Sequence, residues 1–181
     1  MSNEIEVLRD VTHRLEQSGF AYMLTGSFAM SHYAIPRFTR DIDFVVALSE
    51  DDAARVVQLF ETDYYVSPPA VQSAISRQSM FNLIHYAHSI KVDFVILKSS
   101  AYRQYEFARK QRVKINDFEI WIVSKEDLIL SKLLWAKESH SEMQLRDVQN
   151  LLLTGYDEAY VNEWATKLGV AQILKESWPN E

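Results

Sequence analysis

Two aspartates separated by one residue, Asp41 and Asp43, are the side chains in this sequence best placed for chemistry. They open a segment, residues 41–46, in which carboxylates alternate with apolar residues, a pattern that predicts a strand. Side chains alternate between the two faces of a strand, so both carboxylates would leave the same face. Neighbouring carboxylates repel each other and raise each other's proton affinity unless a cation lies between them. Oxygen ligands of this kind suit Mg²⁺ or Mn²⁺.

A Gly-Ser turn precedes this strand. Residues 21–24 are a short apolar run that predicts a strand, and residues 28–33 have the character of a helix start. Between them, Gly26 and Ser27 would let backbone N–H groups and a hydroxyl approach a phosphate, assisted by the dipole of the helix. A side chain at position 26 would block that approach. The simpler interpretation of Ser27 is a helix N-cap, and the same geometry can serve both roles.

The spacing of these features resembles the signature of the polymerase-β-type nucleotidyltransferases. In that superfamily Gly-Ser or Gly-Gly precedes an Asp-x-Asp strand by about the distance that separates Gly26-Ser27 from Asp41-Ile42-Asp43. The segments MFNLIHYAHSIKVDFVIL, VSKEDLILSKLLWAKES and QLRDVQNLL resemble a smaller branch, which contains the AbiEii-like toxins of toxin–antitoxin pairs and uncharacterised relatives. The resemblance covers roughly residues 20 to 153.

The resemblance implies a fold, a reaction and a set of site residues. The fold is α+β: a mixed sheet flanked by helices over residues 1–123, with a helical segment over residues 124–181 packed on this core. The reaction is transfer of a nucleoside monophosphate from an NTP to an acceptor hydroxyl, with two metal ions, Mg²⁺ or Mn²⁺. The implied metal-binding and catalytic residues are Asp41, Asp43 and Asp93, and the implied nucleotide-binding residues are Gly26, Ser27, Arg40, Lys132 and Asp147.

Each of these residues also has an interpretation without chemistry. Asp41 and Asp43 could lie on a solvated edge strand and pair with Arg37 or Arg40, although strands are depleted in aspartate. Asp93 could be an ordinary aspartate at the end of a strand. Lys132 could be a solvated lysine instead of a ligand of phosphate. Asp147 could form a surface ion pair with Arg146, and such a pair contributes little to stability.

Two histidines, His85 and His88, have a spacing that could suggest zinc. On a strand and the turn after it their rings would not converge, and no cysteine or third histidine is placed to complete a site. We therefore do not expect a zinc site there.

Composition limits the classes of protein that the chain can belong to. Its 181 residues are 48% hydrophobic and 24% charged, which is typical of a soluble globular protein. The absence of cysteine excludes disulfides and thiolate metal sites. The first residues lack the features of a signal peptide and no apolar run could span a bilayer, so we expect a cytoplasmic protein without membrane contact. The net charge of −6 does not favour nucleic acid over the whole surface. The candidates for a local basic strip that binds nucleic acid are Arg37, Arg40, Arg103, Arg109, Lys110, Arg112 and Lys114.

The leading function is therefore a metal-dependent nucleotidyltransferase. Its acceptor could be a tRNA end, a protein or a small molecule, and an antitoxin would be a partner if the protein is a toxin. A glycosyltransferase also uses Asp-x-Asp with Mn²⁺, but the Gly-Ser turn and the short chain argue against one. The alternative that is not an enzyme is a member of the same fold that binds a nucleotide or a partner without turnover.

Overall fold

The computed structural model describes residues 2–37, 39 and 41–178. Helices and strands alternate up to residue 122, and the part of the chain after it is helical. The helices are α1 (Asn3–Gln17), α2 (Gly26–Tyr33), the short 3₁₀ helix η1 (Glu50–Asp52), α3 (Ala53–Phe60), α4 (Pro68–Arg77), α5 (Ala101–Ala108), α6 (Lys125–Ser139), α7 (Glu142–Leu152), α8 (Glu158–Lys167) and α9 (Ala171–Glu176).

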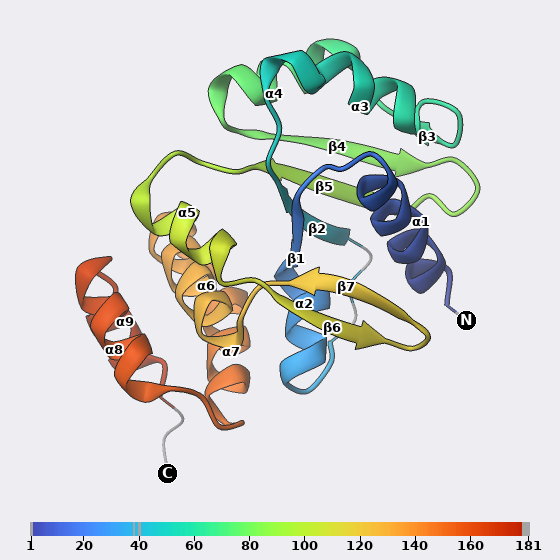
Figure 1. Cartoon of the computed structure of the whole chain (residues 1–181). Coiled ribbons are helices and arrows are strands. Elements are labelled where there is room, and N and C mark those ends of the chain that lie inside the picture. Colours follow the sequence, from blue (N-terminus) through green and yellow to red (C-terminus); the bar gives the residue numbers. More distant parts are fainter. Residues whose placement is uncertain (1, 38, 40, 179–181) are drawn as a thin grey trace.

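The strands form one mixed sheet, which runs through the middle of the molecule (Figure 1). They are β1 (Tyr22–Thr25), β2 (Asp41–Val46), β3 (Tyr64–Tyr65), β4 (Met80–His85), β5 (Lys91–Ile96), β6 (Gln111–Ile115) and β7 (Phe118–Ile122). Their order across the sheet is β3-β4-β5-β2-β1-β7-β6. The pairs β2–β5 and β1–β7 are parallel, and the other neighbours are antiparallel. The predicted α+β class with a mixed sheet is confirmed.

One face of the central strands forms the hydrophobic core. In β2 the apolar residues at even positions, such as Phe44, are fully buried, as the alternating pattern predicts. Phe94 of β5 lies next to Phe44 and is contacted by Phe60 of α3 and by Phe81 of β4, all in edge-to-face geometry. Such aromatic pairs contribute about 0.5–1.5 kcal/mol each beyond the area they bury. This face therefore holds β2 and β5 firmly in place.

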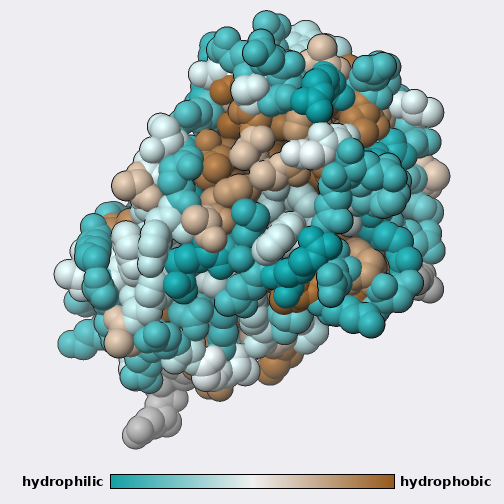
Figure 2. Space-filling model, in the orientation of Figure 1, coloured by the Kyte–Doolittle hydropathy of each residue, from teal (hydrophilic) through white to brown (hydrophobic). Residues whose placement is uncertain are grey.

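The odd-numbered residues of β2 and β5 lie on the opposite face, which carries the charged side chains. Helix α2 follows β1 directly, and α6 and α7 pack against α2. Figure 1 shows α5 to α9 together at one side of the sheet. The surface in the same view is mostly hydrophilic, with apolar side chains gathered in a hollow below α3 and α4 (Figure 2).

The predicted elements are largely confirmed, with differences at their ends. Pro68 and Pro69 are the first two residues of α4, which Ser67 caps. Proline fits the first turn because it lacks an N–H group that would have no partner there. Helix α7 ends at Leu152, with Leu153 as its C-cap in right-handed geometry.

Candidate active site

The β2–β5 pairing sets two of the predicted site residues directly opposite each other. These strands are parallel, with Asp43 facing Asp93 and Asp41 facing Lys91 in the register. Both members of each pair occupy the sheet face opposite the aromatic core. Asp93 is 6% exposed, whereas the Asp41 side chain is 53% exposed. The structure therefore brings Asp43 and Asp93 together inside the protein and leaves Asp41 at the edge of the group.

Gly26 lies against this group because β1 pairs with β2 on the other side. Thr25 faces Asp43 in that antiparallel register, so the turn that follows it passes over the aspartate. A Cβ atom at Gly26 would lie 2.0 Å from Oδ2 of Asp43, and the backbone φ is +64°. Both facts require glycine here, the first for space and the second for conformation. The Gly-Ser turn and the aspartate strand thus meet as the sequence spacing predicts.

The electrostatics at Asp43 are those of a crowded carboxylate. Burial and the nearby charges of Asp93 and Asp41 raise the pKa of Asp43 to about 6, although Lys132 and Lys91 oppose this effect. The cause matches the repulsion predicted for two carboxylates on one strand face, with Asp93 added from the neighbouring strand. Asp43 is therefore a position where an additional positive charge would be favourable.

The counter-ion of the group is a residue that the sequence analysis did not single out. Nζ of Lys91 lies 2.8 Å from Oδ2 of Asp93 and 3.5 Å from Oδ2 of Asp41. Its hydrogen bond to Asp93 helps to raise the pKa of Lys91 above its usual value. We expected Arg37 or Arg40 to pair with the aspartates if no metal were bound. Arg37 pairs with Asp147 instead, and Arg40 lies outside the described residues.

The donor set at this position suits a hard divalent cation. Oδ1 of Asp93 is buried and has no hydrogen-bond partner, so one strong acceptor faces inward unsatisfied. Within the described residues, however, no three His, Cys, Asp or Glu side chains converge closely enough to hold a metal ion. Asp93 and Asp41 are instead joined through the ammonium of Lys91, which lies 2.8 Å from an oxygen of Asp93 and 3.5 Å from an oxygen of Asp41. The residues fit Mg²⁺ or Mn²⁺ by type and charge, provided that Lys91 moves.

A second polar network joins the Gly-Ser turn to the C-terminal helices. The guanidinium of Arg37 donates to Oγ of Ser27 and, from Nε, to Oδ1 of Asp147 at 2.9 Å. The other oxygen of Asp147 accepts from Nζ of Lys132 at 2.7 Å, and Oε1 of Gln144 accepts from the same ammonium at 3.1 Å. Helices α2, α6 and α7 are thus tied together beside Asp43, whose charge interacts with that of Lys132.

These contacts contradict the simpler structural interpretations given above for Ser27, Lys132 and Asp147. Ser27 is not the N-cap of α2, since that position belongs to Thr25 and Ser27 instead accepts a hydrogen bond from Arg37. Lys132 is not a solvated lysine: it is 4% exposed, and burial lowers its pKa. Asp147 does not pair with Arg146, whose partner is Glu142. Burying a lysine and an aspartate is costly unless they pair, so the network has a structural role whatever its further use.

Three arginines of the proposed basic strip form ion pairs within the protein, whereas Lys114 is exposed. Arg103 pairs with Glu106, Arg109 with Asp127, and Arg112 with Glu16 and Glu119. These guanidinium groups neutralise acidic residues of the protein itself. They are therefore poorly available for the phosphates of a nucleic acid, which are bound through excess positive charge.

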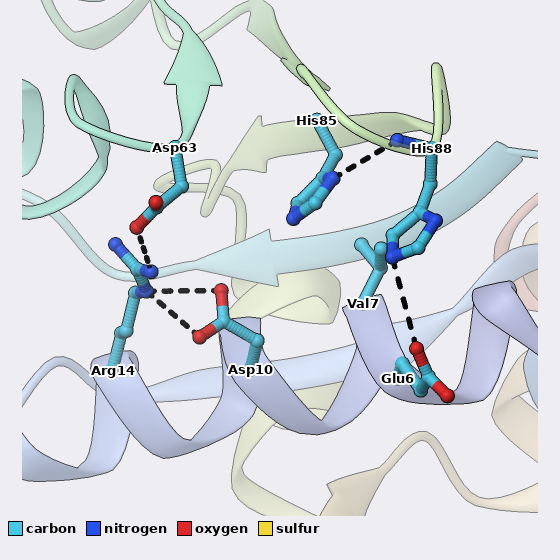
Figure 3. Close-up of a pocket in the computed structure, with 7 residues that line it drawn as sticks. All are labelled: Glu6, Val7, Asp10, Arg14, Asp63, His85 and His88. Carbon is cyan, nitrogen blue, oxygen red and sulfur yellow. Dashed lines mark hydrogen bonds and ion pairs between the residues drawn. The ribbon is translucent and has the colours of Figure 1, made fainter.

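The two histidines lie in a separate pocket of about 300 Å³ between α1 and the β4–β5 connection (Figure 3). Our expectation that their rings would not converge was wrong: His85 and His88 stack with centroids 4.7 Å apart. The backbone N–H of His88 donates to Nδ1 of His85, which brings the rings together. The acidic groups around them are already paired, Asp10 and Asp63 with Arg14. The pocket thus shows neither the carboxylate pair nor the Gly-Ser turn of the site described above.

Several solved structures have a fold similar to that of this chain. A nucleotidyltransferase-like protein from Paracoccidioides brasiliensis aligns with a TM-score of 0.64 at 16% identity, over 97% of this chain and 89% of that one. The enzyme ANT(2")-Ia, in complex with adenylyl-2"-tobramycin, aligns with a TM-score of 0.58 at 10% identity, over 97% and 98%. The lincosamide adenylyltransferase LnuA, bound to lincomycin, aligns with a TM-score of 0.52 at 18% identity, over 84% and 96%.

These alignments show that the chain has the fold of the nucleotidyltransferases. Neither a protein-family model nor a curated protein sequence matches it, so the resemblance to the AbiEii-like branch gains no support. In the part of the chain that the structure describes, no helix has the length and apolar character needed to cross a membrane.

Proposed function

We propose that this protein is a metal-dependent nucleotidyltransferase that transfers a nucleoside monophosphate from an NTP to an acceptor hydroxyl. The observation that carries the proposal is the direct opposition of Asp43 and Asp93 on parallel strands, beside a glycine that leaves no room for a side chain. Like charges in that position are unfavourable without a cation, and Mg²⁺ commonly binds through one or two carboxylates together with substrate phosphates.

The roles follow from the positions of the side chains. Asp41, Asp43 and Asp93 would hold Mg²⁺ or Mn²⁺, which supplies charge stabilisation and lowers the pKa of a hydroxyl bound beside it. Gly26 and Ser27 would meet the triphosphate of the NTP with backbone N–H groups and a hydroxyl. Lys132, fixed by Asp147, would add positive potential on the same side. Arg40 is proposed as a further phosphate contact from the resemblance alone.

The reaction is an in-line displacement. The acceptor oxygen forms a bond to the α-phosphorus while the bond from that phosphorus to the bridging oxygen breaks, and pyrophosphate leaves with the electron pair. The hydroxyl proton must be taken up as this happens. Asp93 is the carboxylate proposed to receive it, because its Oδ1 has no hydrogen-bond partner in the described structure.

A small molecule is the acceptor class that we favour. Three of the arginines that could have formed a nucleic-acid surface, Arg103, Arg109 and Arg112, are used in internal ion pairs. One structurally similar protein is the lincosamide antibiotic adenylyltransferase LnuA with lincomycin bound, and another, ANT(2")-Ia, is in complex with adenylyl-2"-tobramycin. The alignments span nearly the whole length of both. RNA and protein hydroxyls are the competing acceptors.

The same chemistry could also serve a toxin that is held inactive by an antitoxin. This version rests on the resemblance of the segments around Asp93, Lys132 and Asp147 to the AbiEii-like branch. Growth arrest on expression of the wild type, absent for Asp43→Asn and relieved by a neighbouring gene product, would support it. Normal growth on expression of the wild type would contradict it.

The test of the proposed function is a nucleotide-transfer assay with a matched pair of variants. Purified protein is incubated with each NTP, radiolabelled at the α-phosphate, and Mg²⁺ or Mn²⁺, together with total RNA, a protein extract or a pool of hydroxylated small molecules. We expect transfer or pyrophosphate release that is lost in Asp43→Asn and retained in Asp51→Asn, which removes an exposed carboxylate. Activity that survives in Asp43→Asn, or no binding of any NTP by the wild type, would contradict the proposal.

A further inference from the structure

Lys91 stands between the two carboxylates that are proposed to bind metal. Its ammonium is 2.8 Å from Asp93 and 3.5 Å from Asp41, so one cation contacts one oxygen of each. The register explains the position. Lys91 and Asp93 leave the same face of β5, and Lys91 lies directly opposite Asp41 on β2. The arrangement is therefore built into the strand pairing.

The charges of this group do not balance. On one face of the two strands lie the carboxylates of Asp41, Asp43 and Asp93 and a single ammonium, that of Lys91. Asp93 gives Oδ2 to Lys91 and keeps Oδ1 buried without a partner. Lys91 thus satisfies the outer side of the group, toward Asp41. On the inner side Asp43 interacts with the charge of Lys132, but that ammonium is already paired with Asp147. A divalent ion that uses both Asp41 and Asp93 needs the space that Nζ occupies.

We propose that Lys91 is a resident counter-ion that competes with the divalent metal for Asp93 and Asp41. In the metal-free protein the ammonium holds the two carboxylates, and it withdraws when the metal binds. The Lys91 side chain is 38% exposed, so its flexible stem has solvent to move into. Lysine is suited to this exchange because it is a point charge on a four-carbon stem, whereas arginine binds carboxylates through a rigid planar fork. This inference rests on the proposed function only for the presence of a metal site.

The competition has a measurable consequence for metal affinity. Removing the ammonium removes the ion pairs that must break before the metal can use Asp93 and Asp41, and it frees one oxygen of Asp93. We expect Lys91→Gln to bind Mn²⁺ about tenfold more tightly than the wild type, an estimate for a pair near the surface. Lys91→Arg keeps the positive charge and should bind Mn²⁺ no more tightly than the wild type.

The experiment measures Mn²⁺ binding without nucleotide, by calorimetry or from the electron paramagnetic resonance of free Mn²⁺. The matched control is Lys114→Gln on β6, which removes the same charge from an exposed position on the edge strand far across the sheet order. A second measurement is thermal unfolding. We expect Lys91→Gln to unfold at a lower temperature than the wild type without metal, and to gain more from added Mn²⁺.

The outcomes separate the two proposals. If the wild type binds Mn²⁺ and Lys91→Gln binds it with equal or lower affinity, the competition is refuted while the metal site stands. If Lys114→Gln gains as much affinity as Lys91→Gln, the effect is general electrostatics and the competition is again refuted. If neither the wild type nor Lys91→Gln binds Mn²⁺, the metal site itself is refuted, and the proposed function fails with it.

Discussion

Replacing Asp43 by asparagine should make the metal-free protein more stable at neutral pH. Burial and the neighbouring carboxylates raise the pKa of Asp43 to about 6 in the folded protein. The unfolded chain has the lower value, so the folded state binds the proton more tightly. The resulting stabilisation is complete below about pH 4, the pKa of an unperturbed aspartate, and is lost as the pH rises through the folded value. At neutral pH the native state therefore carries an unfavourable charge that asparagine removes.

The size of the expected gain in stability follows from the pKa shift of Asp43. The difference between the folded pKa of about 6 and the model value of 3.8 corresponds to about 3 kcal/mol of differential stability. Asp43 is not completely buried, so part of this repulsion is screened by water. We therefore expect Asp43→Asn to raise the free energy of unfolding by about 1–3 kcal/mol at neutral pH. Near pH 4 the two proteins should have nearly the same stability.

Urea unfolding followed by tryptophan fluorescence measures this difference at both pH values. The matched control, Asp51→Asn, removes an exposed carboxylate in η1 and should shift the midpoint little. Added Mn²⁺ should stabilise the wild type and close the gap, because the bound cation neutralises the repulsion that asparagine relieves. Lower stability of Asp43→Asn than of the wild type at neutral pH, or a stability difference that does not depend on pH, would contradict this prediction.

Two further predictions concern Gly26 and the ion pair between Lys132 and Asp147. Gly26→Ala should destabilise the protein by about 2–4 kcal/mol in urea unfolding, because its Cβ meets Asp43. Gly19→Ala has a similar positive φ but open space around it, and an equal loss there would mean that the contact with Asp43 is unimportant. Asp147→Asn should cost about 3 kcal/mol in thermal unfolding, because it leaves Lys132 buried without its carboxylate partner. The double variant Lys132→Met, Asp147→Leu should recover most of that stability, and no recovery would argue against an unpaired charge as the cause.

The positions of the principal residues were predictable because local patterns determine them. Alternation along residues 41–46 and 91–96 predicts which side chains share a face, and the strands have the expected bounds within a residue or so. The conformation of Gly26 follows from a short strand that runs directly into a helix. Each of these inferences uses only the spacing of residues along one or two neighbouring elements, and that spacing can be read directly from the sequence.

The partners of those residues were not predictable, because they depend on register between distant strands and helices. Lys91 lies two positions before Asp93, so its face could be read from the sequence, but its contact with Asp41 requires the parallel register of β2 and β5. Arg37 could be seen in the basic loop. That its guanidinium would join Ser27 to Asp147 depends on how α7 packs against α2.

The parallel pairing of β2 with β5 also bears on how the protein folds. β4 and β5 are neighbours in the chain, whereas α3, β3, α4 and β4 lie between β2 and β5, so we expect β5 to pair with β2 later than with β4. The same docking step that joins Phe44 to Phe94 on one face forces Asp43 against Asp93 on the other. Burial of the aromatic rings therefore drives a step that charge repulsion opposes. We therefore expect the site to be completed late in folding. Divalent cations should change the rate of this late pairing step more than the rates of the early steps.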